Sequence, residues 1–160
     1  MSNKKIAVSA CLMGIDCKYN GKNNRNEKIL DYVKDMEYIT ICPECYGGLT
    51  TPRVPSEIEE GKSGEDYIKN REDFHVYSKE GADVTEEFVK GAEMALEKLQ
   101  KNGVTKAIMK ESSPSCGVNK IYTGRFDGTK KEGMGVTAAL FKENGIEMLS
   151  EKDIESGKTF

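Results

Sequence analysis

The sequence predicts a single α/β domain in which helices flank a mainly parallel sheet. The chain has 160 residues, a length typical of one domain. Short β-branched segments alternate with segments of helical periodicity, and this order is typical of a parallel sheet covered by helices. Hydrophobic residues make up 37% of the chain and charged residues 32%. This composition favours a globular domain over a disordered or membrane-spanning chain.

The first part of the chain predicts two strands around one helix. Residues 5–9 and 38–41 are short β-branched runs and form the strands. Residues 27–36 carry apolar side chains at helical spacing, at positions 29, 30, 33 and 36. Residues 42–64 contain three prolines and four glycines and predict a long ordered loop. Loops of that length in compact domains are usually functional or disordered.

The middle of the chain predicts its strongest helix. Asp83 begins this helix, because Asp83 and Glu86 have the spacing of a capping box. Apolar residues from Phe88 to Leu99 share one face, and Asn102-Gly103 ends the helix. A short strand over residues 74–77 precedes it.

The rest of the chain predicts further alternating elements. These are a strand over 107–109, a loop over 110–119, an extended segment over 121–123, a helix over 136–143 and a strand over 146–149. Right-handed crossovers between parallel strands would place their ends at one edge, in a Rossmann-like three-layer arrangement. The predicted domain spans residues 1–150, followed by a C-terminal tail over 151–160.

Charge and hydropathy argue against several classes of protein. The chain has 24 Lys and Arg against 27 Asp and Glu, a net charge of −3. This mildly acidic charge balance gives no indication of a basic surface that would bind nucleic acid or a membrane. No apolar run approaches the roughly 20 residues of a membrane span, and the apolar stretch near the N-terminus is too short for a signal peptide. We therefore expect a cytoplasmic protein, whose thiols stay reduced.

Five cysteines stand beside a single histidine, His75. In a reducing compartment, five thiols favour burial, metal binding or nucleophilic chemistry over disulfides. Cys11, Cys42 and Cys116 each follow a predicted strand, and the carboxyl ends of parallel strands form a common crevice. We therefore expect these thiols to converge, and three thiolates suit zinc or an iron–sulfur cluster. Ordinary burial of each cysteine is the competing interpretation.

Cys42 also begins a C-x-x-C pair with Cys45, which suits a redox dithiol or half of a zinc site. A redox dithiol requires a helix that begins at the motif, and the following Gly47-Gly48 argues against one. A structural zinc ion needs four ligands. These would be Cys11, Cys42, Cys45 and Cys116, or a set that includes Cys17, so the zinc alternative stays open.

Polar residues near the same edge offer further chemistry. Glu44 follows the strand-end Cys-Pro and is a candidate general acid or base. The simplest alternative interpretation of Glu44 is an ordinary carboxylate in a solvated loop. Ser112, Ser113 and Ser115 are candidate donors to a bound anion or sulfur, although serines in loops often only form turns.

Two cations are candidate contacts for an anionic or carbonyl group. Arg53 lies between two prolines, and Lys110 ends the third strand. Each is equally suited to pairing with a surface carboxylate. Neither GxxxxGK[ST] nor a strand-linked GxGxxG is present, so the sequence gives little support to nucleotide binding.

Several motifs together resemble one known family. They are Ser9-Ala-Cys-Leu-Met-Gly14 with Tyr19-Asn-Gly21, Cys42-Pro-Glu44 with Gly47-Gly-Leu49 and Pro52-Arg53, Gly81-Ala-Asp-Val-Thr85, Lys110 with Ser113-Pro-Ser-Cys-Gly117, Ile121-Tyr122, and Gly135-Val-Thr-Ala138. By these motifs the chain is identified as a member of the thiouracil desulfidase family (domain of unknown function 523, DUF523). The resemblance extends from the first strand to Leu149.

The resemblance implies a [4Fe-4S] cluster held by Cys11, Cys42 and Cys116, with a fourth iron open to a substrate sulfur. It implies non-redox, hydrolytic desulfuration of a thiolated small molecule such as thiouracil. By the same motifs, Glu44 is the acid/base carboxylate and Ser113 the catalytic serine. The candidate substrate-binding residues are Arg53, Lys110, Ser112, Ser115 and Tyr19.

Two positions depart from the pattern of the family. Cys17 and Cys45 are extra thiols, and either of them on the fourth iron would remove the open position. The main alternative is therefore a zinc-stabilised binding module, in which the metal contributes folding energy. A factor that handles sulfur for RNA modification is a further alternative, which no basic patch supports.

Overall fold

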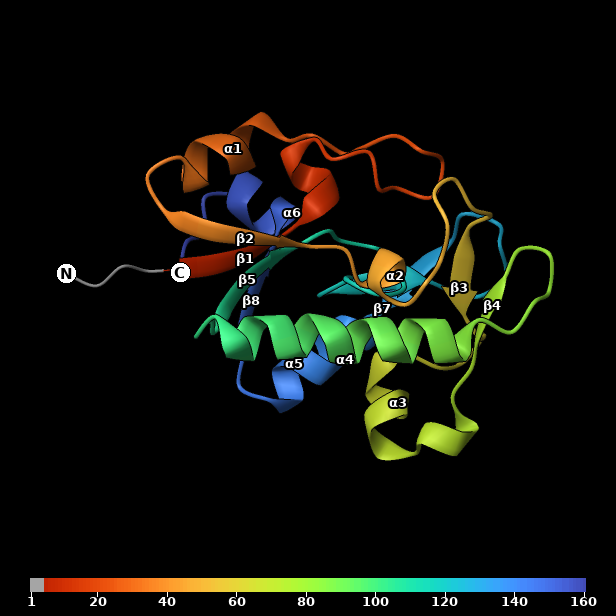
Figure 1. Ribbon diagram of the computed structural model, residues 1–160. Helices are drawn as coiled ribbons and strands as arrows, with labels where there is room; N and C mark the ends of the chain where they lie inside the picture. Colours follow the sequence, from red (N-terminus) through yellow and green to blue (C-terminus); the bar gives the residue numbers. More distant parts are fainter. Residues whose placement is uncertain (1–4) are drawn as a thin grey trace.

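The computed structural model describes residues 5–160, so the first four residues of the predicted domain lie outside the described part. A sheet of four parallel strands forms its centre (Figure 1). The strand order is β2 (Glu37–Ile41), β1 (Lys5–Ser9), β5 (Lys106–Met109) and β8 (Glu147–Ser150). The predicted α/β fold with a parallel sheet is confirmed.

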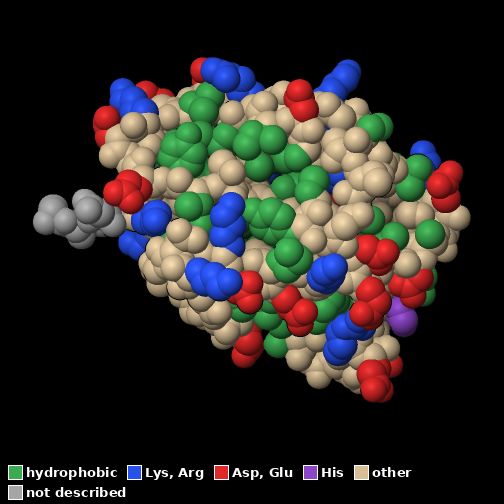
Figure 2. Space-filling model, viewed as in Figure 1, with side chains coloured by type: hydrophobic (Ala, Val, Ile, Leu, Met, Phe, Trp, Pro, Cys, Tyr) green, Lys and Arg blue, Asp and Glu red, His purple; other side chains and the backbone are tan. Residues whose placement is uncertain are grey.

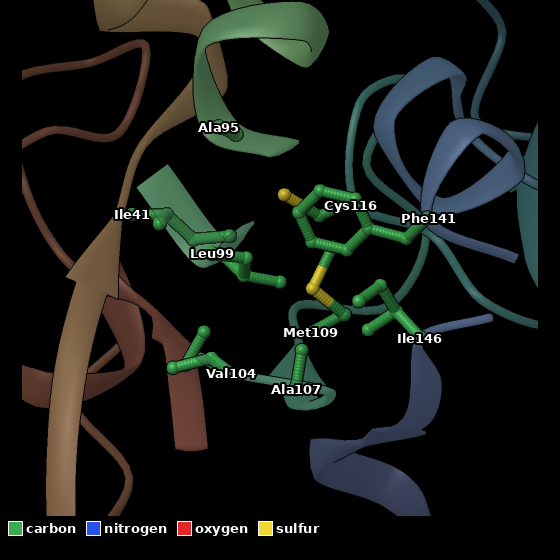
Figure 3. Packing of buried hydrophobic residues seen from close by; sticks show 10 residues of the cluster. Ile41, Ala95, Leu99, Val104, Ala107, Met109, Cys116, Phe141 and Ile146 are labelled. Carbon is green, nitrogen blue, oxygen red and sulfur yellow. The ribbon is translucent and has the colours of Figure 1, made fainter. Parts of the chain in front are cut away.

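Helices cover both faces of this sheet, which gives three layers (Figure 1). α1 (Glu27–Val33) and α6 (Glu151–Glu155) lie on one face, and α4 (Thr85–Lys101) and α5 (Val136–Glu143) lie on the other. Alternate residues of β1 serve the two faces: Ile6 and Val8 pack with α1 and α6, whereas Ala7 packs with α4 and α5. Figure 3 shows the hydrophobic cluster on the side of α4 and α5.

Smaller elements surround the carboxyl end of the sheet. Two small antiparallel sheets are formed by β3 (Ser56–Ile58) with β4 (Val76–Ser78), and by β6 (Lys120–Tyr122) with β7 (Lys130–Glu132). The short helices are η1 (Ala10–Met13), α2 (Pro43–Tyr46), α3 (Gly64–Lys69) and η2 (Arg71–Asp73).

The surface carries charges of both signs. On the face that Figure 2 shows, Lys and Arg side chains are interspersed with Asp and Glu. Within residues 5–160, no helix combines the length and the apolar composition that a bilayer crossing requires.

Some predicted boundaries and one predicted loop are wrong. The loop expected over residues 42–64 contains α2, β3 and the start of α3. The expectation that no helix begins at the C-x-x-C motif is also wrong, because α2 makes one turn there. Elements of three or four residues are too short to show a hydrophobic period. The strongest helix begins at Thr85 without a capping box, because the Asp83 carboxylate accepts from Thr85 two residues on. The strand β7 and the helix α6 were not predicted.

The backbones of α2 and α4 are in direct contact. A Cβ at Gly91 would lie 1.9 Å from the carbonyl oxygen of Pro43, and a Cβ at Gly47 would lie 1.8 Å from that of Glu87. Neither position therefore has room for a side chain. Since α2 directly follows Cys42, this contact fixes the end of β2 relative to α4.

We expect Gly91→Ala to destabilise the protein, although alanine normally favours a helix interior by about 1 kcal/mol over glycine. Overpacking typically costs about 1–3 kcal/mol, and urea unfolding would measure this loss. Glu93→Ala on the exposed side of the same helix is the control, with an expected change within about 0.5 kcal/mol. An unchanged midpoint for Gly91→Ala would contradict the rigid contact between α2 and α4.

Candidate active site at the carboxyl ends of three strands

A cavity of about 380 Å³ opens at the carboxyl ends of β1, β2 and β5. Ser9 borders it at the end of β1, Ile41 at the end of β2 and Lys110 just after β5. The fold brings together residues as far apart in the sequence as Cys11 and Cys116. All of the residues proposed from the sequence line this cavity: Cys11, Tyr19, Cys42, Glu44, Arg53, Lys110, Ser112, Ser113, Ser115 and Cys116.

The three strand-end cysteines come from separate elements. Cys11 lies in η1, Cys42 joins β2 to α2, and Cys116 lies in the loop after β5, where it belongs to the core cluster of Figure 3. Burial raises the pKa of Cys11 and raises that of Cys116 to about 12. The pKa of Cys42 is lowered to about 6, because hydrogen bonding to the Cys17 thiol, aided by hydrogen bonding at Cys45, outweighs burial. Cys42 is therefore the thiol that most readily becomes the thiolate that a metal requires.

The two additional thiols lie beside Cys42. The Sγ atoms of Cys42 and Cys45 are 3.3 Å apart, and the backbone carbonyl of Cys17 lies 3.9 and 4.0 Å from these two sulfurs. The pKa of Cys17 is raised, chiefly by its hydrogen bond with Cys42, and that of Cys45 is raised chiefly by burial. All five cysteines are free.

Glu44 is held by Arg53. The Nε and one terminal nitrogen of Arg53 lie 3.1 and 3.0 Å from Oε1 of Glu44, and the two side chains are only 9% and 16% exposed. The other guanidinium donors bond to Thr50, Thr51 and the carbonyl oxygen of Cys17, each at 3.1 Å. Four of the five N–H groups of the guanidinium thus have hydrogen-bond acceptors within the protein, and the fifth belongs to the terminal nitrogen that forms the ion pair with Glu44.

The serines continue this network from the other side of Glu44. Ser115 Oγ lies 3.0 Å from Oε2 of Glu44 and 2.9 Å from Ser113 Oγ. Ser113 Oγ accepts the backbone N–H groups of Ser115 and Cys116, both at 3.1 Å. Ser115 is buried, whereas Ser113 is partly exposed. Ser112 is buried and has a positive φ of 67°.

The loop after β5 is folded around the buried carboxylate of Glu111. Oε2 of Glu111 accepts the side-chain amide of Asn119 at 2.8 Å. Burial raises the pKa of Glu111, but the hydrogen bonds from the loop outweigh burial and lower the pKa below its usual range. Oε1 accepts four backbone N–H groups at 2.8–3.3 Å, from Ser112, Val118, Asn119 and Lys120.

Glu151, the first residue of α6, anchors the same loop at its start. Its Oε1 accepts the backbone N–H of Glu111 at 2.7 Å, and its Oε2 pairs with Lys110 Nζ at 3.3 Å. Lys110 Nζ also donates to the carbonyl oxygen of Glu111 at 2.8 Å. One ammonium N–H of Lys110 is left over from these two contacts.

The chain matches the family model described as 2-thiouracil desulfurase over residues 6–153. The chain belongs to this family. It is 42% identical over 149 residues to the uncharacterized protein YbbK of Bacillus subtilis (strain 168), which covers 93% of this chain and 97% of YbbK. It is also similar to the solved structure of the [4Fe-4S]-dependent thiouracil desulfidase TudS (DUF523Vcz), with 39% identity, a TM-score of 0.79, and coverage of 96% of this chain and 94% of TudS. The family predicted from the motifs is confirmed.

Three thiols of this desulfurase family member are placed so that an iron–sulfur cluster fits them. Among residues 5–160, no three Cys, His, Asp or Glu side chains are grouped so that they would hold one metal ion. A [4Fe-4S] cluster would be held by cysteine thiolates, and Cys11, Cys42 and Cys116 would be the residues that hold it. Cys11, Cys42 and Cys116 border one cavity from three elements, as that arrangement requires.

Sequence reasoning missed several residues around this site. Asn24 donates its side-chain amide to Cys11 Sγ at 3.4 Å, and nothing in the Asn-rich segment distinguishes it from its neighbours. Tyr122 and Phe126 line the cavity from the β6–β7 hairpin, and buried Glu57 accepts the N–H of Phe126 at 3.2 Å. The turn after β6 and the strand β7 gave no periodic signal.

We expect Glu111→Gln to destabilise the protein by about 1–3 kcal/mol at neutral pH, because it leaves buried N–H groups without a charged acceptor. The folded-state pKa of Glu111 is lowered, so this stabilisation is present above the unfolded pKa of about 4.3. It is lost as the pH falls through the lower, folded-state value. The difference in unfolding free energy between the wild type and the variant should therefore shrink below about pH 4.

The control for this measurement is Glu143→Gln, an exposed carboxylate on α5. Urea unfolding at a series of pH values should give Glu143→Gln the same profile as the wild type. A Glu111→Gln variant with wild-type stability at pH 7 would contradict the role of this carboxylate in holding the loop.

Proposed function

We propose that this chain binds a [4Fe-4S] cluster through Cys11, Cys42 and Cys116 and hydrolytically removes sulfur from a thiolated small molecule of the thiouracil type. The observation that carries the proposal is the meeting of three strand-end thiols with Glu44 and Ser113 in one cavity. Family membership and the similarity to TudS support it. We place the activity in the cytoplasm, where such thiols stay reduced.

The reaction exchanges sulfur for oxygen without electron transfer. A thiocarbonyl and water become a carbonyl and hydrogen sulfide, and both hydrogen atoms of the water leave with the sulfur. When bound, the cluster supplies a Lewis acid for the substrate sulfur. The protein then has to remove a proton from the attacking water and return a proton to the leaving sulfur.

Glu44 is the group that we assign to this proton transfer. Its carboxylate is partly buried at the cavity, so it is shielded from bulk water, and Arg53 fixes its orientation from behind. We therefore assign Arg53 to positioning Glu44. Ser113, which we assign as the catalytic serine, lines the cavity and lies 2.9 Å from Ser115 Oγ, which in turn lies 3.0 Å from Glu44.

The remaining contacts to a substrate come from the cavity wall. Lys110 offers its one remaining ammonium N–H to an oxygen or nitrogen of a thiopyrimidine. Tyr19, which is 40% exposed at the cavity, offers a ring surface on which a planar base can stack. Ser112 lines the wall beside Ser113.

Anaerobic reconstitution with iron and sulfide should give a coloured protein with about four iron atoms per chain. Cys11→Ser, Cys42→Ser and Cys116→Ser should each lose most of the visible absorbance, because each removes a ligand. Cys45→Ser is the matched control and should keep the cluster. A colourless protein that binds only zinc, and that loses its zinc on Cys45→Ser, would support the zinc-stabilised module instead.

Glu44→Gln should lower kcat for sulfide release from thiouracil by about 10²–10⁴-fold, the usual effect of removing an acid/base group. The amide keeps the shape of the carboxylate and should leave the visible absorbance of the cluster unchanged. Glu59→Gln, a partly exposed carboxylate variant outside the cavity lining, should retain wild-type kcat. Full activity of Glu44→Gln would overturn the assignment of this residue.

A further inference from the structure

Phe126 is a phenylalanine that the hydrophobic core does not use. The chain has five phenylalanines, and the other four pack in hydrophobic clusters: Phe74, Phe88, Phe141 and Phe160. Phe126 belongs to none of the clusters in the described part of the chain and is partly exposed at the cavity. An aromatic side chain that is left out of the core and lines a cavity is available to a ligand.

The backbone of Phe126 has a conformation that a bulky residue rarely adopts. Its φ is 56°, which lies in the left-handed region that favours glycine. Within residues 5–160, only Ser112 and Phe126 combine a side chain with a positive φ, and both line the cavity. Such strain persists only where the surrounding structure holds it, and it is concentrated at functional sites.

The buried carboxylate of Glu57 holds the backbone of Phe126. Glu57 lies in β3 and is only 8% exposed. Its Oε1 accepts the backbone N–H of Gly124 at 2.9 Å and that of Phe126 at 3.2 Å. One oxygen therefore fixes the turn between β6 and β7 at two positions, on either side of Arg125.

The same turn is docked on the end of β3. A Cβ at Gly124 would lie 2.6 Å from the carbonyl oxygen of Ile58 and 2.6 Å from the backbone nitrogen of Glu60, so the turn has no room for a side chain there. Arg125 also pairs with Glu60. The ring of Phe126 is thus carried by a turn whose position relative to β3 is fixed.

From this geometry we propose that Phe126 is a substrate-binding residue whose ring stacks on the flat heterocycle of the substrate, and that Glu57 is the positioning residue that holds it. The proposal rests on the proposed function and narrows its substrate class to thiocarbonyl compounds with a planar aromatic ring. Stacking needs only a π face on each partner. A ring that is already held in place loses little conformational freedom when the substrate binds.

Steady-state kinetics of the reconstituted enzyme tests this role. Stacking contacts the face of the whole ring, of which only one carbon atom reacts, so it contributes mainly uniform binding, which affects KM rather than kcat. Phe126→Leu keeps an apolar side chain without a π face and should raise KM for 2-thiouracil by about tenfold, with kcat within about twofold of the wild type. Phe126→Tyr keeps the ring and should hold KM within about threefold of the wild type.

A matched pair of inhibitors separates stacking from general damage to the site. Uracil and 5,6-dihydrouracil share their carbonyl and N–H groups, but only uracil has a flat aromatic ring. The wild type should bind uracil about tenfold more tightly than 5,6-dihydrouracil, and Phe126→Leu should reduce this ratio to about threefold or less. Tyr38→Leu, an exposed aromatic of β2 outside the cavity lining, is the control and should keep the wild-type ratio.

A double variant tests the positioning role of Glu57. Glu57→Ala removes the acceptor of two N–H groups and should raise KM as Phe126→Leu does, whereas Glu57→Gln keeps an oxygen acceptor and should hold KM within about threefold of the wild type. Adding Glu57→Ala to Phe126→Leu should raise KM no further, because a residue that acts through Phe126 has no effect once the ring is gone. A KM equal to the product of the two single effects would overturn the positioning role.

Tryptophan fluorescence gives a readout that is independent of activity, because the chain contains no tryptophan. Phe126→Trp places a single indole on the turn. In the reconstituted protein, uracil should change its emission in a saturable way, and 5,6-dihydrouracil at the same concentrations should leave it nearly unchanged. Emission that does not respond to uracil would overturn the proposal, as would a wild-type KM in Phe126→Leu.

Failure of this proposal is distinguishable from failure of the proposed function. If only the role of Phe126 fails, the wild type releases sulfide from thiouracil and Phe126→Leu has the wild-type KM. If the proposed function fails, the reconstituted wild type releases no sulfide, while the emission of Phe126→Trp still reports whether a flat ring binds at the turn.

Discussion

The carboxyl ends of three adjacent parallel strands decide where the chemistry of this protein takes place. β2, β1 and β5 are neighbours in one ladder, with Ser9 opposite Ile41. The Ser9 hydroxyl also accepts the backbone N–H of Lys110 at 3.0 Å, which ties the end of β1 to the end of β5. Because the ladder fixes the strand ends to one another, the loops that leave them start from fixed positions. The cavity is bounded by those loops.

Paired charges keep these loops in place. Glu44 is bound by Arg53, Glu151 by Lys110, and Glu111 by a ring of backbone N–H groups. A buried carboxylate is costly unless it is paired or hydrogen-bonded, so each partner restricts the carboxylate to one arrangement. The polar wall of the cavity is therefore organised before a ligand arrives, which is the condition under which fixed dipoles are effective.

The sequence predicted the site better than it predicted the wall around it. Cys11, Cys42 and Cys116 were grouped because each follows a predicted strand, and short β-branched runs reveal where the strands end. Glu111 was missed because its importance depends on N–H groups that converge from residues seven to nine positions away, which no local pattern records. Arg53 was noticed for its charge, but only the fold shows that it pairs with Glu44 and donates to three further acceptors within the protein. The one-turn helix α2 and the strand β3 were missed because neither is long enough for a period to appear.

The role of Glu151 links the site to a late part of the chain. The cavity begins at residues that follow the first strand, yet the loop that carries Cys116 is anchored to the first residue of α6. During synthesis, the ribosome must therefore have released residue 151 before the cavity wall can close. A nascent chain that has exposed Cys11 and Cys42 still holds only an open half of the site. Assembly of the complete site is in this sense a property of the finished fold, since Cys116 joins Cys11 and Cys42 only when the loop after β5 is anchored.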